Sequence, residues 1–158
     1  MIYCFDMSAF IAARQESFPN DVTPKLWSDY LPGLVAAKRM VPPKDVVLEL
    51  EKKTGKDDEL CQWVKSQDGL VRALDDALLK EIKRIVNRYR RLIEQKPGRN
   101  RAARIVIALA SVTGSTVVTK EGMSNSLEKP KIPDVCRAEG IKCTGMLDVI
   151  RAEKWVSR

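Results

Sequence analysis

The chain alternates short, continuous apolar runs with longer segments in which apolar side chains recur every three or four positions. Continuous runs are typical of strands buried on both faces, and the three- and four-residue spacing is typical of amphipathic helices. We expect strands at residues 2–5, 40–41, 115–119 and 141–144. We expect helices at residues 8–13, 26–35, 45–53, 57–66, 71–95, 102–112, 134–138 and 146–152. This order predicts a three-layer α/β/α domain around a short, mainly parallel central sheet.

The length of 158 residues suits a single domain, so residues 1–158 are expected to share one core. No apolar run approaches the roughly 20 residues that span a bilayer, and the start lacks the basic and apolar regions of a secretion signal. The four cysteines include no Cys-x-x-Cys pair, which favours reduced, buried thiols. We therefore expect a cytoplasmic protein without membrane association.

Two carboxylates directly follow expected strands. Asp6 comes after the first apolar run, and Glu121 comes after the β-branched run that forms the third expected strand. Because the carboxyl ends of parallel strands meet at one edge of a sheet, where ligands gather, the two side chains could line one site. The hydroxyls of Ser8 and Thr119 are placed to support it. Asp6 could instead cap the helix that follows, since Asp is a preferred N-cap residue.

Histidine is absent from the sequence, and this narrows the chemistry. Zinc sites that use His, and Ser–His or Cys–His nucleophilic pairs, are excluded within this chain. Carboxylate, hydroxyl and lysine chemistry remain, as does a hard cation such as Mg²⁺ or Mn²⁺ held by oxygen ligands. Glu49 would add a third carboxylate if its helix crosses the same edge of the sheet; otherwise it is a solvated residue on a helix surface.

The net charge of +7 is concentrated in one segment. Residues 80–104 hold ten basic and two acidic side chains, whereas the rest of the chain is close to neutral. Such a segment is the electrostatic footprint of a polyanion partner, either a nucleic acid or an acidic protein, although most charge runs are only solvated helix faces. The residues expected to contact RNA are Lys80, Arg84, Arg88, Arg91, Arg99 and Arg101.

Several of these residues fall in short motifs that follow one another in a distinctive order. The motifs are Tyr3-Cys4-Phe5-Asp6-Met7-Ser8, Pro43-Lys44-Asp45-Val46-Val47-Leu48-Glu49-Leu50, Arg104-Ile105-Val106-Ile107-Ala108-Leu109-Ala110 and Val117-Val118-Thr119-Lys120-Glu121. In this order they resemble a PIN domain over nearly the whole chain. A later motif is similar to a PIN-like subfamily of formerly unknown function, close to the VapC-type toxins. That motif is Lys131-Ile132-Pro133-Asp134-Val135-Cys136.

PIN domains are Mg²⁺- or Mn²⁺-dependent nucleases, commonly ribonucleases, and many are the toxins of toxin–antitoxin pairs. The resemblance implies that Asp6, Glu49 and Glu121 are the catalytic, metal-binding carboxylates, with Ser8 and Thr119 in support. It also implies an RNA substrate, held through its backbone by the basic segment. A cognate antitoxin protein would be the partner. A homodimer would also fit, because many PIN toxins pair through helices.

One position departs from the family pattern. An aspartate is expected near the start of the apolar helix, and Ala103 stands there instead. Because alanine has no oxygen ligand, the resemblance predicts a catalytically impaired nuclease that binds metal poorly. Either an engineered inactivation or a natural loss would explain the alanine.

Two other functions are consistent with parts of the sequence. A non-catalytic module could bind RNA or a protein through the basic segment alone. A Mg²⁺ phosphohydrolase of the haloacid dehalogenase type would also place Asp6 after the first strand, but it needs a second aspartate where Ser8 stands. For a dimer, Trp27, Tyr30 and Leu34 could form the contact surface, although a stripe of this kind more often packs into the core.

Overall fold

A computed structural model describes residues 1–41, 44–55, 57–67, 75–90, 101–128 and 130–155. A parallel sheet lies at its centre, with the strand order β1-β2-β3. The strands are β1 (Tyr3–Phe5), β2 (Thr116–Val118) and β3 (Cys143–Thr144). Cys4 pairs with Val117, which pairs in turn with Cys143. The strand expected at 40–41 is reduced to a single parallel bridge between Met40 and Tyr3.

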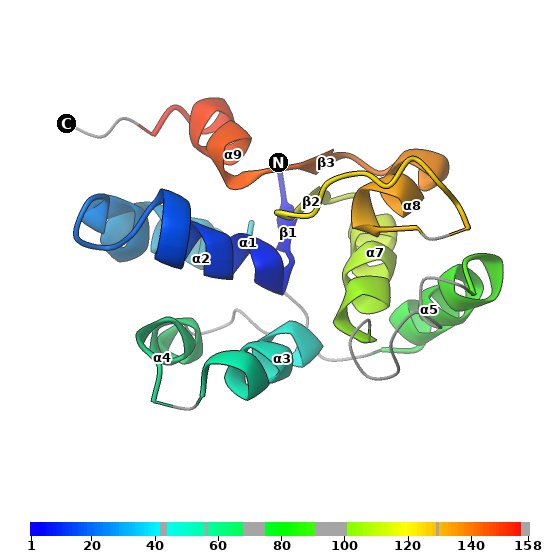
Figure 1. The fold of residues 1–158 in the computed structure, drawn as a ribbon, viewed down its shortest axis with the longest axis horizontal. Helices are drawn as coiled ribbons and strands as arrows, with labels where there is room; N and C mark the ends of the chain where they lie inside the picture. Colours follow the sequence, from blue (N-terminus) through cyan, green and yellow to red (C-terminus); the bar gives the residue numbers. More distant parts are fainter. Residues whose placement is uncertain (42–43, 56, 68–74, 91–100, 129, 156–158) are drawn as a thin grey trace.

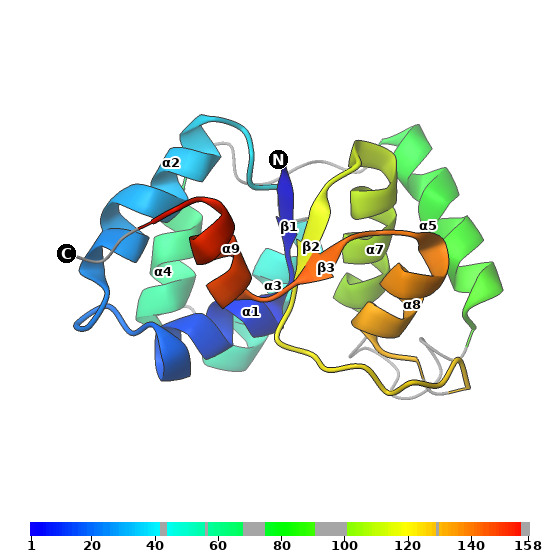
Figure 2. The same cartoon turned by 90° about the horizontal axis from the view of Figure 1, so that it is seen from above.

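Helices cover both faces of this sheet. In chain order they are α1 (Met7–Ala12), the π-helical turns η1 (Ala13–Ser17) and η2 (Leu26–Tyr30), α2 (Leu31–Ala36), α3 (Lys44–Thr54), α4 (Glu59–Ser66), α5 (Asp76–Arg88), α7 (Arg101–Thr113), α8 (Ile132–Glu139) and α9 (Met146–Ala152). The sheet lies between α1, α2, α4 and α9 on one side and α5, α7 and α8 on the other (Figures 1 and 2). The fold is therefore the expected three-layer α/β/α arrangement.

The central helix of one layer is α7. It packs on β1, β2, α3, α5 and α8, and its residues from Ile105 to Ala110 are buried on every side. Such a helix must be apolar all round, as its sequence is. Gly114 then turns the chain into β2 with a φ of +67°, a left-handed conformation that favours glycine. Because α7 runs back along the parallel strands, its first turn lies at the carboxyl edge of the sheet.

The stripe Trp27, Tyr30 and Leu34 belongs mainly to the core of the other layer. Trp27 and Leu34 are buried, and the Trp27 ring meets Trp63 edge-on at 5.0 Å between centroids. The Trp27 indole N–H donates to the Phe18 carbonyl at 2.8 Å. Tyr30 is only partly buried. The core interpretation of this stripe is confirmed for its two buried members, which cannot form a dimer surface in this fold.

The long helix expected over residues 71–95 is shorter than predicted. It begins after Asp75, whose carboxylate accepts the N–H of Leu78 at 2.8 Å, and it ends at Arg88. Tyr89 leaves helical geometry, with φ −123° and ψ 57°, yet its ring stays buried. The predicted end was wrong because the apolar spacing continues through Tyr89, whereas the helical backbone ends at Arg88. Both ends of the predicted range lie outside the described residues.

The helix expected at 134–138 begins earlier, at Ile132, with Pro133 in its first turn. Proline is favoured there because the first turn of a helix needs no backbone N–H donor. Among the helices of the described ranges, none is both long and apolar enough to span a membrane.

Candidate active site at the carboxyl edge of the sheet

Asp6 lies directly after β1, at the edge where the strands end. Its backbone N–H extends the sheet ladder by donating to Val118 O at 2.9 Å, and the side chain is buried. Asp6 stands at the N-cap position of α1, but its carboxylate makes no capping hydrogen bond. The alternative of a simple helix cap is therefore wrong.

Two hydroxyls hold the Asp6 carboxylate instead. Ser8 Oγ donates to Asp6 Oδ2 at 2.6 Å, and Thr119 Oγ1 lies 3.2 Å from the same oxygen. The two hydroxyl oxygens are 3.0 Å apart. Backbone N–H groups fix them in turn, since Lys120 donates to Ser8 Oγ at 3.0 Å and Glu121 donates to Thr119 Oγ1 at 3.1 Å. Both contacts that the described residues make with the Asp6 carboxylate fall on Oδ2, and among these residues none contacts Oδ1.

Glu121 joins this cluster electrostatically. The residue as a whole is exposed, and its Oε2 accepts the N–H of Ile132 at 3.2 Å. The protein atoms crowding its carboxylate raise the pKa of Glu121, and the negative charge of Asp6 adds to the rise, while the Ile132 N–H and the charge of Lys131 oppose it. Asp6, Ser8, Thr119 and Glu121 are therefore brought together, as expected.

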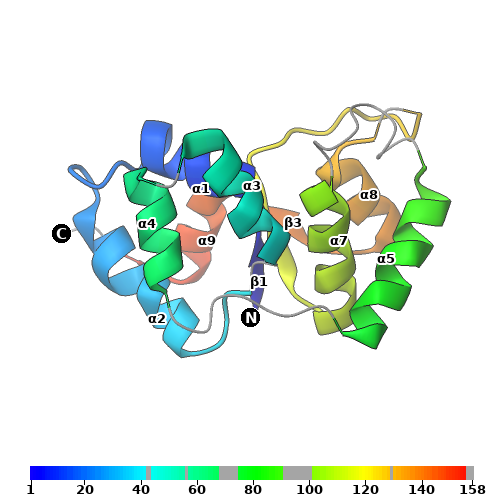
Figure 3. The same ribbon diagram turned by 90° about the horizontal axis from the view of Figure 1, so that it is seen from below.

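Glu49, the third expected carboxylate, lies on another element, α3. It is half-buried on α3, and α3 packs against α1 and α7. Figures 2 and 3 show α3 beside the junction of β1 and α1. Within the ranges that the structure describes, no group of three or more His, Cys, Asp and Glu side chains lies close enough together to hold a metal ion. The role of Glu49 as a third ligand therefore stays a prediction.

Ala103 lies in the first turn of α7, which the parallel topology places at the carboxyl edge of the sheet. Its methyl group packs partly buried against the core. By sequence, this turn (Arg101–Arg104) holds no acidic residue. Ala103 supplies no oxygen ligand, and the need for an acid at this position stays a prediction of the PIN resemblance.

Asp134 is a buried carboxylate that the sequence did not single out for the site. Its Oδ2 accepts hydrogen bonds from Ser124 N at 2.9 Å, Ser124 Oγ at 2.8 Å and Lys131 N at 2.8 Å, and its Oδ1 accepts one from Asn125 N at 2.9 Å. Burial works to raise the pKa of Asp134, but these donors outweigh it and lower the pKa. The sequence carries no capping-box signal for Asp134, because Lys131 stands at the N-cap where that box has Ser or Thr.

Two exposed arginines of the basic segment form ion pairs with carboxylates. Arg84 donates to Glu81 at 2.6 Å and to Glu139 at 3.0 Å, and Arg88 Nε lies 3.7 Å from Glu139. The two pairs with Glu139 link α5 to α8. Lys80 and the neighbouring Lys83 are exposed. Arg91 and Arg99, and the side chain of Arg101, lie outside the described residues.

Comparison with known proteins identifies one family. No curated protein and no solved structure matches the chain significantly. A family model described as "Domain of unknown function (DUF4411)" matches residues 3–157, a range that includes Asp6, Ser8, Thr119, Glu121 and Asp134. The chain therefore belongs to the DUF4411 family.

Proposed function

We propose that this protein is a metal-dependent endoribonuclease of PIN type, the toxin of a toxin–antitoxin pair, in a form whose catalysis is impaired at Ala103. The observation that carries the proposal is the pair of hydroxyls that hold one oxygen of Asp6 at the carboxyl edge of the sheet. Glu121 lies within electrostatic range of that carboxylate. A carboxylate oriented in this way, beside a second one, suits cation binding and the chemistry of a phosphodiester.

The donor set of the cluster fits a hard cation, because it consists of oxygens. Asp6 and Glu121 would hold Mg²⁺ or Mn²⁺, with Glu49 as the predicted third ligand. When bound, such a cation neutralises charge on a phosphodiester and lowers the pKa of a water molecule. The raised pKa of Glu121 supports this assignment, since part of that rise comes from a like charge that a cation would offset.

The residues around Asp6 would position rather than react. Ser8 and Thr119 fix the rotation of the carboxylate, and the backbone N–H groups of Lys120 and Glu121 fix the two hydroxyls. Groups that orient a metal ligand commonly affect metal affinity or activity about 10–100-fold. Ser8→Ala should therefore weaken the site without removing a ligand.

RNA is the proposed substrate because the charge of the chain favours a polyanion. The exposed Lys80 and Lys83 offer phosphate contacts on α5, and the equally exposed Arg84 and Arg88 would first have to give up part of their pairing with Glu139. An antitoxin protein would cover the site or the basic surface in a cytoplasmic setting, and a homodimer remains part of the proposal.

The decisive experiment restores the missing acid. Ala103→Asp adds a carboxylate to the first turn of a helix, where the helix dipole favours a negative charge, so the fold should tolerate it. We expect RNA cleavage by this variant with Mg²⁺ or Mn²⁺, none with chelator, and little by the chain as it stands. Ala103→Asn is the matched control, since it has nearly the same shape without the charge.

Two further variants in the Ala103→Asp background locate the chemistry. Asp6→Asn should abolish cleavage, and Ser8→Ala should reduce it about 10–100-fold. Calorimetry with Mn²⁺ should show binding that is tighter for Ala103→Asp than for Ala103→Asn. If a folded Ala103→Asp protein neither binds Mn²⁺ more tightly nor cleaves any RNA, the nuclease proposal is refuted.

A non-catalytic RNA-binding module is the second candidate, and the alanine at position 103 favours it. Here the exposed lysines of α5 would carry the function. Lys80→Gln with Lys83→Gln should lower RNA affinity and reduce the salt slope of log K by about 1.4, or about 0.7 per phosphate contact. Lys38→Gln with Lys142→Gln, which removes the same charge at exposed positions elsewhere, is the control. If the two double variants weaken RNA binding equally, the α5 lysines contribute only to the overall positive charge and form no specific RNA-binding surface.

A further inference from the structure

Lys131 begins next to the acidic pair of the proposed site, Asp6 and Glu121. The backbone N–H of the following residue, Ile132, donates to Glu121 Oε2 at 3.2 Å. Two covalent bonds join the Lys131 Cα to that nitrogen, so the Cα lies within about 6 Å of the Glu121 oxygen. The flexible four-carbon stem of a lysine can carry its ammonium across such a distance. Lys131 is therefore able to place a positive charge at this site.

The backbone of Lys131 is fixed by the buried carboxylate of Asp134. The Lys131 N–H donates to Asp134 Oδ2 at 2.8 Å, and the same oxygen accepts the N–H of Ser124 at 2.9 Å. Asp134 thus ties the start of α8 to the loop that follows Glu121. Because the contact of Lys131 with Asp134 uses its backbone, exchanging the Lys131 side chain for that of another residue with a backbone N–H leaves this anchor in place.

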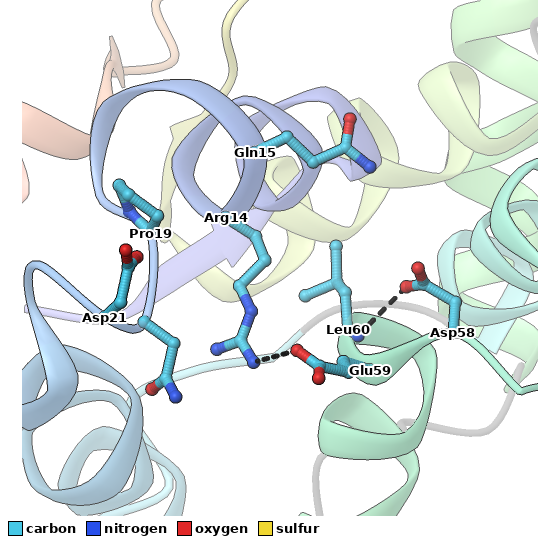
Figure 4. A pocket seen from close by; sticks show the side chains of 8 residues that line it. Arg14, Gln15, Pro19, Asp21, Asp58, Glu59 and Leu60 are labelled. Atoms are coloured by element: carbon cyan, nitrogen blue, oxygen red, sulfur yellow. Dashed lines mark hydrogen bonds and ion pairs between the residues drawn. The ribbon is translucent and has the colours of Figure 1, made fainter.

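The ammonium of Lys131 is free, unlike two cations on and beside η1. Lys131 is exposed, and no carboxylate of the described residues forms an ion pair with it. Lys120 Nζ, in contrast, pairs with Glu16 of η1 at 3.1 Å. Arg14 of η1 pairs with Glu59 at 3.3 Å (Figure 4). A ligand can therefore bind the Lys131 ammonium without breaking an ion pair.

The charge of Lys131 already acts on the acidic pair. Crowding by protein atoms and the charge of Asp6 raise the pKa of Glu121, and the positive charge of Lys131 opposes this rise. Two neighbouring carboxylates repel an approaching phosphodiester, because all three groups are negative. A bound cation would supply part of the positive charge that is needed. A lysine beside the pair adds more, without occupying a coordination position of that cation.

We propose that Lys131 binds a non-bridging oxygen of the RNA phosphate that is to be cleaved, and holds this phosphate beside Asp6 and Glu121. The inference rests on the proposed function, to which it adds a substrate-binding residue. A lysine ammonium is a compact charge with three donors, and it binds phosphate oxygens without needing the fixed geometry of a guanidinium. Lys131 would thereby bring the phosphate and the two carboxylates together.

Salt-dependent RNA binding without metal tests this contact separately from cleavage. With chelator present, fluorescence anisotropy of a labelled single-stranded RNA oligonucleotide should show a slope of log K against log salt that is about 0.7 smaller for Lys131→Gln, the effect of one phosphate contact. Lowering the salt tenfold should then widen the affinity difference from the parent chain about fivefold. Lys142→Gln, which removes the same charge at an exposed position before β3, is the matched control and should leave the slope unchanged.

Other replacements of Lys131 sharpen the test. Lys131→Arg keeps the positive charge and should keep the salt slope, whereas Lys131→Glu should weaken RNA binding more than Lys131→Gln does. In the Ala103→Asp background, Lys131→Gln should lower kcat/KM for RNA at least about tenfold. The affinity for Mn²⁺ should not fall, because removing a positive charge makes the acidic pair more attractive to a cation.

Two results would overturn the proposal. One is an equal salt slope for Lys131→Gln and Lys142→Gln, and the other is a loss of Mn²⁺ affinity in Lys131→Gln, which would mean that Lys131 only supports the structure of the site. A smaller slope for Lys131→Gln without cleavage by Ala103→Asp would refute the nuclease alone. Cleavage by Ala103→Asp with a kcat/KM that Lys131→Gln does not change would refute the role of Lys131 alone.

Discussion

Glu121 lies near the start of the loop between β2 and α8, and Asp134 lies just beyond its end, in the first turn of α8; the two carboxylates differ in burial and in hydrogen bonding. Asp134 is 5% exposed and accepts four hydrogen bonds, three of them from backbone N–H groups. Glu121 is exposed as a residue and accepts one backbone N–H, from Ile132. The donors lower the pKa of Asp134 against the effect of its burial, whereas crowding raises the pKa of Glu121.

The difference separates a carboxylate that builds the fold from one that is available for chemistry. The acceptor positions of Asp134 are taken by Ser124, Asn125 and Lys131, so the loop is closed around it. Glu121 keeps acceptor capacity beside another negative charge. In a cluster of acids, the number of backbone donors on each carboxylate thus indicates its role better than its burial does.

The largest expected effect is on stability, at Asp134. Asp134→Ala would leave three backbone N–H donors of a partly buried loop without their acceptor, and should lower the free energy of unfolding by about 3 kcal/mol. Urea unfolding at neutral pH measures it. Glu121→Ala, at the other end of the loop, should change stability by less than about 1 kcal/mol. Similar losses for the two variants would contradict the distinction between them.

The sequence predicted the three layers and the position of Asp6 at the carboxyl end of β1, because both depend on local patterns. Apolar runs mark β1 and β2, and the residue after a parallel strand lies at its carboxyl edge wherever the rest of the chain goes. Asp6 and Glu121 both follow their strands in the structure, and their role as ligands stays a prediction. The capping alternative for Asp6 needed coordinates, because Thr119, which holds the carboxylate, is 113 positions away.

Features that depend on partners far away in the chain could not be predicted from the sequence. Counting charges could not show that Arg84 and Arg88 face Glu139 on another helix. Periodicity could not show that Tyr89 leaves the helix, because its ring still faces the core. The backbone donors around Asp134 have no periodic signature at all. Composition therefore identified a basic segment, while the structure shows which of its described members are engaged.

A smaller stability effect is expected at Glu139, where the comparison extends to a third carboxylate. Its side chain is 9% exposed and accepts from Arg84 at 3.0 Å and from the Tyr89 hydroxyl at 2.7 Å. Glu139→Ala should cost about 1 kcal/mol, because the Tyr89 hydroxyl loses its acceptor, while the Arg84 and Arg88 side chains, which are 43% and 61% exposed, stay hydrated. Asp148→Ala, which breaks the exposed pair with Arg151, should cost less than about 0.5 kcal/mol and serves as the control.

Thermal unfolding of these two variants, with urea unfolding beside it, would decide whether the arginines of α5 are structural. If Glu139→Ala lowers the free energy of unfolding no more than Asp148→Ala does, the ion pairs of Arg84 and Arg88 contribute little stability, and both arginines are available to bind RNA. In that case the charge reversal of both arginines should lower RNA affinity without lowering stability.

The smallest effect, and the sharpest test of the comparison, is the pH dependence of stability. Because the pKa of Asp134 is lowered by folding, its contribution is present above the usual aspartate value of about 3.9 and is lost as the pH falls through the folded pKa. Because the pKa of Glu121 is raised by folding, the folded state binds its proton more tightly. Its contribution is therefore unfavourable above the folded pKa and disappears below about 4.3.

Single variants should reveal these opposite signs. Glu121→Gln should be more stable than the parent chain by about 0.5 kcal/mol at neutral pH, and the gain should vanish as the pH falls below about 4. Asp134→Asn should be less stable at neutral pH, and its deficit should shrink only at lower pH, as the parent loses the ionised carboxylate. Urea midpoints between pH 3 and pH 7 measure both. A stability gain for Glu121→Gln that persists unchanged in acid would mean that charge is not its cause, and the assignment of Glu121 as the chemically available carboxylate would fail.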